Sequence, residues 1–105
     1  MKKILALSAI ASLSFSAWAV DPAAATEIAQ KNGCLACHSI DTKIVGPAWK
    51  DVSKKYAGDA AAEEQLMFKV KKGTKGNWGA IPMPPNPTVK DADIKTMVEY
   101  ILTLK

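Results

Sequence analysis

Two cysteines and the only histidine of the chain stand together in the segment Cys34-Leu35-Ala36-Cys37-His38. The pattern C-x-x-C-H is typical of covalent attachment of a c-type haem, in which each thiol forms a thioether with a vinyl group. Residues i and i+3 of a helical turn lie on one face, so both sulfur atoms can reach one edge of the haem. The spacing therefore predicts attachment through Cys34 and Cys37, with the His38 ring as an axial ligand of the iron.

Two other chemistries use the same residue types. A reactive disulfide between Cys34 and Cys37 would be expected beside a βαβ pattern, and none surrounds the motif. A structural zinc ion takes four Cys or His ligands, whereas the chain holds two cysteines and one histidine in total. Haem attachment is therefore favoured over a thiol–disulfide site, and zinc is the weakest of the three interpretations.

The second axial ligand decides the chemistry, because an open position permits ligand binding or catalysis whereas a filled one favours electron transfer. Without a second histidine, the candidates are Met67, Met83 and Met97, and lysine is a weaker option. Met67 and Met97 fall on apolar helical stripes, where methionine usually packs in the core. Met83 lies in the segment IPMPPNP (81–87), whose prolines fix φ and stiffen an extended loop. We predict Met83 as the ligand. A haem peroxidase or gas-binding protein, in which Met83 is not a ligand, is the alternative.

Caps and apolar periodicity predict four helices around these residues and no strand, so the fold class is all-α. Residues 74–87 hold four of the six prolines of the chain, with Trp78, Ile81 and Met83 among them, which predicts a long ordered loop. The first expected helix runs from the cap at Asp21-Pro22 to the stop at Asn32-Gly33, and the second from Ala48 to about Tyr56. The third is expected from a cap at Asp59 to Gly73. The fourth is expected to begin at the capping signal Thr88–Asp91 and to continue along the apolar stripe from Ile94 to Leu102.

The first 19 residues have the pattern of a secretory signal peptide. Lys2 and Lys3 precede an apolar run from Ile4 to Phe15, and a small-x-small cleavage pattern follows at residues 17–19. The run is shorter than the roughly 20 apolar residues of a membrane span, so we expect cleavage rather than stable membrane insertion. Residues 20–105 would then form a single domain in the bacterial periplasm, where thioether formation would consume both thiols.

The charge of the chain is mildly positive. The formal net charge is +4, and Lys2 and Lys3 contribute two of these charges, so residues 20–105 carry about +2. This balance gives no support to nucleic-acid binding.

A domain this short buries a modest core and is often stabilised by a metal or cross-links, so a covalent haem would supply much of its apolar interior. We expect a monomer.

Five segments in a fixed order resemble the small bacterial class I cytochromes c of the cytochrome c-551 type (cytochrome c8 subgroup). They are Asn32–His38, Ile40–Lys43, Val45–Ala48, Trp78-Gly79 and Ile81–Asn86. The resemblance extends over essentially all of residues 21–105. It implies a cytochrome c fold of about four helices wrapped around one covalently bound haem c, with the first and last helices crossing and a long Pro/Gly-rich ligand loop.

The same resemblance implies a function. Such proteins are periplasmic soluble electron carriers and not enzymes, and a His/Met-ligated haem c transfers one electron at a time. The expected donor is a quinol-oxidising cytochrome complex. The expected acceptor is a terminal reductase such as nitrite reductase, or an oxidase or peroxidase.

Four further residues obtain roles from the resemblance. The Pro47 carbonyl would accept a hydrogen bond from the other ring nitrogen of His38, which fixes the tautomer of the ligand. Trp78 would hydrogen-bond a haem propionate, and Asn86 would contact the sulfur of Met83. Relatives often place an arginine near a propionate where this chain has Lys69, a point donor that lacks the bidentate fork of arginine.

The thioether edge of an enclosed haem is expected nearest to solvent, so electrons would leave there through a short-lived complex with a redox partner. An apolar rim surrounded by lysines would form the contact. The residues expected there are Ile40, Val45, Ile81 and Pro84 for the rim, and Lys31, Lys43 and Lys75 around it.

Overall fold

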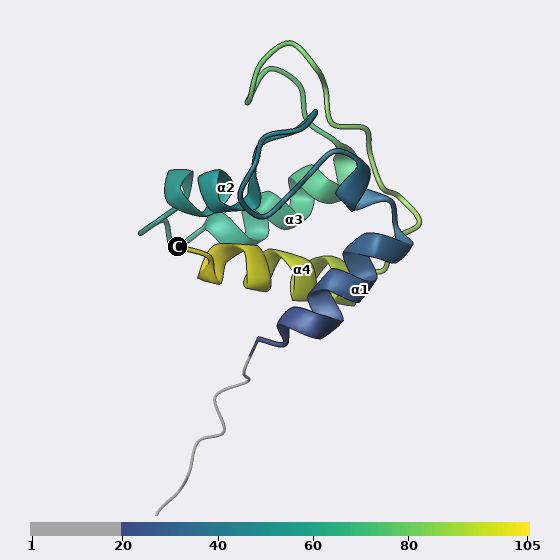
Figure 1. The fold of residues 1–105 in the computed structure, drawn as a ribbon. Coiled ribbons are helices and arrows are strands. Elements are labelled where there is room, and N and C mark those ends of the chain that lie inside the picture. Colours follow the sequence, from purple (N-terminus) through teal and green to yellow (C-terminus); the bar gives the residue numbers. More distant parts are fainter. Residues whose placement is uncertain (1–19) are drawn as a thin grey trace, which may run out of the picture.

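A computed structural model describes residues 20–105, and the predicted signal peptide (1–19) lies outside the described residues. Within that range the chain forms four α-helices and one short 3-10 helix, and no strand (Figure 1). The elements are α1 (Pro22–Lys31), η1 (Cys34–Ala36), α2 (Trp49–Lys55), α3 (Ala62–Lys72) and α4 (Asp91–Thr103). The all-α prediction is confirmed. None of these helices is long and apolar enough to cross a membrane.

Helix α1 begins and ends where its caps predict. Asp21 Oδ1 accepts hydrogen bonds from the backbone N–H groups of Ala23 at 3.0 Å and Ala24 at 3.2 Å, and Pro22 occupies the first helical position. These contacts satisfy amides that a helix start leaves free. The helix ends before Gly33, whose φ of 73° turns the chain directly into η1. The cap and stop of α1 thus determine where the Cys34 turn begins.

Helix α4 is the element against which α1, α2 and α3 all pack. Ile94 and Val98 of α4 are each only 1% exposed, and Ala25 and Ala29 of α1 are fully buried. These alanines leave little side chain between the two helices, so α1 can cross α4 closely (Figure 1). The crossing of the first and last helices agrees with the fold implied by the resemblance.

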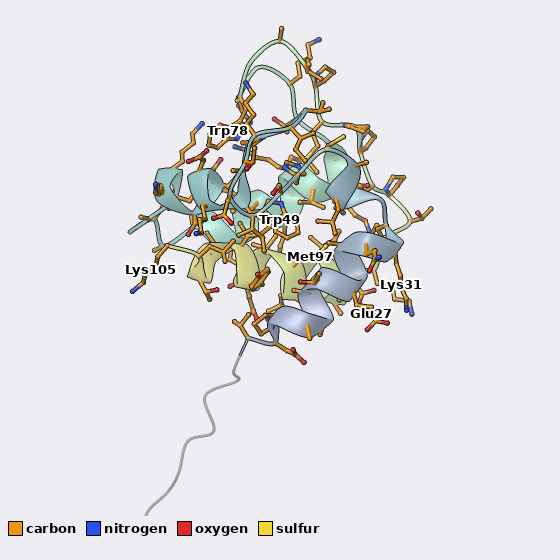
Figure 2. The ribbon with its side chains drawn as sticks, viewed as in Figure 1. Glu27, Lys31, Trp49, Trp78, Met97 and Lys105 are labelled. Carbon is orange, nitrogen blue, oxygen red and sulfur yellow. The ribbon has the colours of Figure 1, made fainter. Side chains whose placement is uncertain are left out.

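Helix α2 contacts both the segment that follows η1 and helix α4. The backbone N–H of Trp49 donates to the Ser39 carbonyl at 2.9 Å, and the buried indole meets the ring of Tyr100 edge-on at a centroid distance of 6.2 Å. Trp49 and Met97 both belong to the buried core (Figure 2). At the other end of α2, the buried Ser53 hydroxyl lies 2.7 Å from the carbonyl oxygen of Leu104. These contacts hold α2 on α4.

The start of α3 differs from the predicted one. Asp59 does not cap the helix: its Oδ1 accepts a hydrogen bond of 2.9 Å from Ala61 N–H, and α3 begins only at Ala62. The side chain therefore closes a local turn before the helix, as aspartate commonly does. The acidic residues Glu63 and Glu64 in the first turn complement the helix dipole instead.

Helix α4 also begins without the expected cap. Lys90 is the N-cap residue, and no side chain caps the helix. The prediction of a side-chain cap at Thr88–Asp91 is therefore wrong. The ammonium of Lys71 on α3 is bonded to both sides of this junction, at 2.7 Å from the Val89 carbonyl and 3.0 Å from Asp91 Oδ1. A tertiary contact thus stabilises the helix start that local sequence was expected to stabilise.

The loop between α3 and α4 contains one short region of paired backbone. Thr74 and Met83 form an antiparallel bridge, with N–H to O distances of 3.0 and 2.8 Å in the two directions. Gly73 permits this pairing, because a Cβ added there would lie 2.7 Å from the Met83 carbonyl oxygen and its φ is +80°. The residues from 75 to 82 therefore form an exposed excursion that returns to Met83.

Candidate haem site

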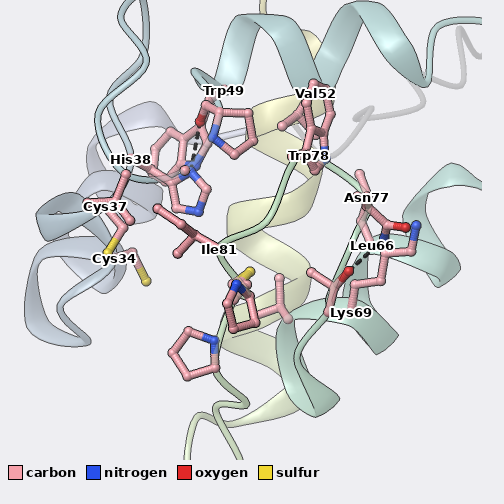
Figure 3. A pocket seen from close by; sticks show the side chains of 18 of the residues that line it. Cys34, Cys37, His38, Trp49, Val52, Leu66, Lys69, Asn77, Trp78 and Ile81 are labelled. Atoms are coloured by element: carbon pink, nitrogen blue, oxygen red, sulfur yellow. Dashed lines mark hydrogen bonds between the residues drawn. The ribbon is translucent and has the colours of Figure 1, made fainter.

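A cavity of about 650 Å³ lies between the haem-attachment segment, the α3–α4 loop and the helices (Figure 3). Cys34, Cys37 and His38 line one part of its wall, and Met83 lines it from the loop. The helices contribute mainly apolar side chains, namely Trp49 and Val52 from α2, Leu66 and Val70 from α3, and Met97, Val98 and Ile101 from α4. The fold thus brings the four predicted haem residues to one cavity.

His38 is held so that one of its ring nitrogens stays available. Its Nδ1 lies 2.8 Å from the carbonyl oxygen of Pro47. A carbonyl only accepts hydrogen bonds, so Nδ1 carries the proton and Nε2 retains its lone pair. A Cβ at Gly46 would lie 2.6 Å from His38 Cε1, so only glycine fits beside the ring there. Nε2 is therefore the atom through which His38 can bind a metal.

The two thiols lie on one turn. Cys37 N–H donates to the Cys34 carbonyl at 3.2 Å, and both half-buried side chains line the cavity without forming a disulfide. Figure 3 shows both sulfur atoms on the same side of the cavity. Burial, followed by the nearby Cys37 thiol, raises the pKa of Cys34 above its ordinary value. A reactive thiol of the disulfide-exchange type has a lowered pKa, so this environment does not favour that chemistry.

The three candidate methionines occupy different places. Met83 is half-buried and lines the cavity, held by its bridge to Thr74. Met97 also lines the cavity, but it is buried in the helical core. Met67 packs against the core at its edge and is not among the residues that line the cavity. Position alone therefore leaves Met83 and Met97 as the two methionines that can reach a group in the cavity.

Asn86, which the resemblance places at the sulfur of Met83, is bonded to three carbonyl groups. Its side-chain Nδ2 donates to the Val70 carbonyl at 3.0 Å and to the Pro84 carbonyl at 3.3 Å. Its backbone N–H donates to the Lys71 carbonyl at 3.1 Å. Asn86 therefore joins the end of the α3–α4 loop to α3.

Lys69 and Trp78 both line the cavity, and each has a partner that the sequence did not identify. Lys69 Nζ donates to the Tyr56 hydroxyl at 2.6 Å, and Lys55 Nζ lies 4.6 Å from the ring centroid of Trp78. Nothing in the local sequence pattern shows that the Tyr56 hydroxyl meets Lys69. These pairs are 13 and 23 residues apart, so only the fold brings them together.

The charges around the cavity suit a haem. Among residues 20–105, three lysines line it, Lys43, Lys69 and Lys75, and no aspartate or glutamate does. Haem is a flat, largely apolar ring that carries carboxylates, so it needs apolar walls and positive groups at one side. The cavity provides both, together with two thiols and one imidazole that has a free nitrogen. The residues present therefore fit a covalently held haem.

An all-α fold of this size, with a C-x-x-C-H turn and a histidine facing an apolar cavity, defines a c-type haem protein. A profile of the family described as "Cytochrome c" matches residues 22–105. The chain is 53% identical over 94 residues to a cytochrome c-551 of Allochromatium vinosum, covering 88% of this chain and all of the relative. It is 49% identical over 109 residues to a cytochrome c-551 of Pseudomonas aeruginosa, and the match covers the whole of both chains.

Solved structures agree with the sequence comparison. The crystal structure of wild-type Nitrosomonas europaea cytochrome c552 matches with a TM-score of 0.73 and 52% identity, covering 76% of this chain and 99% of the other. The chain belongs to the cytochrome c family, and within it to the class I cytochromes of the c-551 type. It is a small electron carrier with one covalently attached haem c, and it is not an enzyme.

Proposed function

We propose that this cytochrome carries single electrons in the periplasm through a haem held covalently by Cys34 and Cys37 and ligated by His38 and Met83. The observation that carries the proposal is the His38–Pro47 hydrogen bond, which leaves Nε2 free at a cavity that Met83 also lines. When bound, the haem supplies the one-electron chemistry. The chain itself excludes water with apolar walls, holds the tautomer of His38 and presents the thioether of Met83.

Met83 is preferred over Met97 because of how each side chain is held. Met97 is buried in the core on α4, where a methionine commonly fills space. Met83 is on a loop whose backbone is paired with Thr74 and closely contacted by Gly73, and the adjacent Pro84 cannot donate to alternative pairings. Such a loop can keep one thioether in place while the iron changes charge. We therefore assign the second ligand to Met83, with Lys69 and Trp78 near the propionates.

A docking surface for redox partners is part of the proposal. Three apolar residues that line the cavity are strongly exposed: Ile44 by 51%, Val45 by 44% and Ile81 by 66%. Lys43 and Lys75 lie among them in the cavity wall. We define the apolar rim as Ile44, Val45 and Ile81. An exposed apolar patch bordered by positive charge suits brief contact with an acidic partner.

Two residues expected at that surface are left out of the proposed surface, and one is added. Ile40 packs against the core and is only half-exposed, so it does not belong to the rim. Lys31 pairs with Glu27 at 3.3 Å on α1, which partly offsets its charge. Ile44, which was not predicted, is more exposed than Val45 and is added to the rim.

The physiological pathway follows from the resemblance. The donor is a quinol-oxidising cytochrome complex, and the acceptor is a terminal reductase such as nitrite reductase, or an oxidase or peroxidase. Residues 1–19 are removed on export, and the mature single domain of residues 20–105 acts as a monomer. Support for this pathway comes from the family membership and from the signal-peptide pattern of the sequence.

The central test is spectroscopic. The purified chain should begin at Val20 and be heavier by one haem, and carbon monoxide should leave the spectrum of the reduced protein unchanged. A carbon monoxide complex that forms readily in the reduced parent would instead indicate an open iron position, as in a peroxidase or gas-binding protein. Turnover with a candidate nitrite reductase or oxidase, monitored by reoxidation, would then identify the acceptor.

A further inference from the structure

The excursion of residues 75–82 is attached to the helices at one place. All of its residues are exposed, and its two ends meet in the Thr74–Met83 bridge. Within residues 20–105, the hydrogen bonds and cation–π contacts that join this excursion to a helix all come from Lys55, in the last turn of α2. Lys55 is therefore well placed to control the position of the loop.

The contacts of Lys55 continue toward Met83. Its Nζ lies 4.6 Å from the Trp78 ring centroid and 3.4 Å from the Asn77 carbonyl oxygen. The side-chain amide of Asn77 donates to the Thr74 hydroxyl at 2.6 Å. Thr74 is in turn the backbone partner of Met83, at 2.8 and 3.0 Å. A continuous set of contacts thus connects the end of α2 to the backbone of Met83.

Lys55 acts from outside the cavity. Asn77 and Trp78 both line the cavity wall, whereas Lys55 does not. The Lys55 ammonium therefore does not compete with Lys69 for a negatively charged group in the cavity. The closest polar contact of its ammonium, at 3.4 Å to the Asn77 carbonyl, is long, so the cation–π contact with Trp78 accounts for much of the attachment.

We propose that Lys55 is a positioning residue for the loop that carries Met83. By holding Trp78 and Asn77 against α2, it keeps the Thr74–Met83 bridge closed and so restrains the Met83 side chain. The proposal rests on the proposed role of Met83 as an iron ligand only for its effect on haem chemistry. A cation–π contact at an exposed site, with a weak hydrogen bond added, shifts an opening equilibrium by about fivefold.

The test compares Lys55→Met with Lys54→Met, which removes the same charge from the adjacent exposed position in the last turn of α2. Amide hydrogen exchange of Thr74 and Met83 is measured by NMR in the reduced holoprotein, together with the rate of imidazole binding to the oxidised one. In Lys55→Met both rates should rise by about fivefold. Lys54→Met should behave like the parent. Lys55→Arg should keep both rates at the parental values, because arginine also stacks on an indole ring.

The outcomes separate this proposal from the assignment of Met83. Unchanged exchange at Thr74 and Met83 in Lys55→Met would overturn the role of Lys55, and so would equal acceleration in Lys54→Met. Faster exchange with an unchanged rate of imidazole binding would uphold Lys55 as the residue that positions the loop while removing Met83 as the ligand. A double variant Lys55→Met, Trp78→Leu should exchange no faster than Trp78→Leu alone, since the contact is already lost.

Discussion

The side chain of His38 shows how few contacts are needed to prepare a metal ligand. The Pro47 carbonyl accepts from Nδ1 at 2.8 Å, and Gly46 leaves the space in which the ring lies. A backbone carbonyl is a suitable partner because its oxygen only accepts hydrogen bonds, so the proton must lie on Nδ1. The neighbouring residues Gly46 and Pro47 therefore determine both the tautomer and the position of the imidazole.

At the residue scale, Met83→Ala should open one axial position while the haem stays attached through both cysteines. Loss of a thioether that favours ferrous iron should lower the potential by on the order of 0.1 V, a part of the roughly 0.8 V that axial ligands span. A redox titration and cyanide binding to the oxidised protein measure both effects. Met97→Leu, which keeps a similar volume in the core, is the matched control and should retain the parental potential. The reverse result, with Met97→Leu altered and Met83→Ala unaltered, would exchange the two assignments.

At the element scale, a carboxyl group of α3 lies near one of α4 at the edge of the helix contact. Slight burial, then a hydrogen bond shared with Glu99 and the charge of Glu99, raise the pKa of Glu63, and Lys95 opposes the shift. A raised pKa means that the folded state holds this proton more tightly than the unfolded chain does. The stabilisation is therefore complete at low pH and is lost as the pH rises through the folded pKa.

Glu63→Gln should therefore stabilise the protein near pH 7, where the charged pair repels, by about 0.3 kcal/mol for so exposed a pair. Near pH 4 the gain should disappear, because Glu63 is then largely protonated. Urea unfolding of the reduced holoprotein at both pH values measures the difference. Glu64→Gln removes the same charge from the next, exposed position of α3 and should lack this pH dependence. An equal gain at both pH values would argue against the Glu63–Glu99 pair.

At the scale of the whole molecule, the cavity is large for the protein that encloses it. Its walls are largely apolar and partly open to solvent, so without the haem they would be exposed to water at about 25 cal/mol per Å² of apolar surface, against a total stability of only about 5–15 kcal/mol for a small domain. A Cys34→Ser, Cys37→Ser variant isolated without haem should therefore be largely unfolded. Far-ultraviolet circular dichroism is the measurement, and Met83→Ala, which keeps its haem, is the folded control. Native-like helicity in the haem-free variant would show that the helices hold without the cofactor.

The lysines beside the apolar rim are expected to affect the rate of association with a redox partner. If Lys43 and Lys75 steer an acidic partner toward the apolar rim, association should slow steeply with salt, since the Debye length is about 10 Å at 0.1 M. Lys43→Glu with Lys75→Glu should slow electron transfer by about tenfold at low salt and leave the potential nearly unchanged. Stopped-flow mixing with the partner measures this, and Lys105→Glu at the far end of the chain is the control (Figure 2). Rates indifferent to salt and to the reversals would leave recognition to the apolar rim alone.

Short-range patterns in the amino-acid sequence were enough to identify the cofactor, the family and the helical class. These features depend on local patterns: three residues within one turn for the haem, a cap at Asp21, glycine stops at Gly33 and Gly73, and apolar spacing along each helix. Such local patterns predict helices and turns well, because a helix or a turn involves only residues that are close in the chain. The prediction that α3 starts at Asp59 was wrong, because the same local pattern fits two structures: aspartate favours a turn as readily as a helix cap.

The packing of whole helices sets which distant side chains meet. The packing of α1, α2 and α3 on α4 sets the distances at which Lys55 reaches Trp78 and at which Lys69 reaches Tyr56. It also turns the amide of Asn86 toward the carbonyl groups of Val70 and Pro84. No single-residue propensity encodes such pairs, since each depends on the angles and separations of whole helices. The haem chemistry was therefore readable from the sequence, whereas the contacts that hold the α3–α4 loop were not.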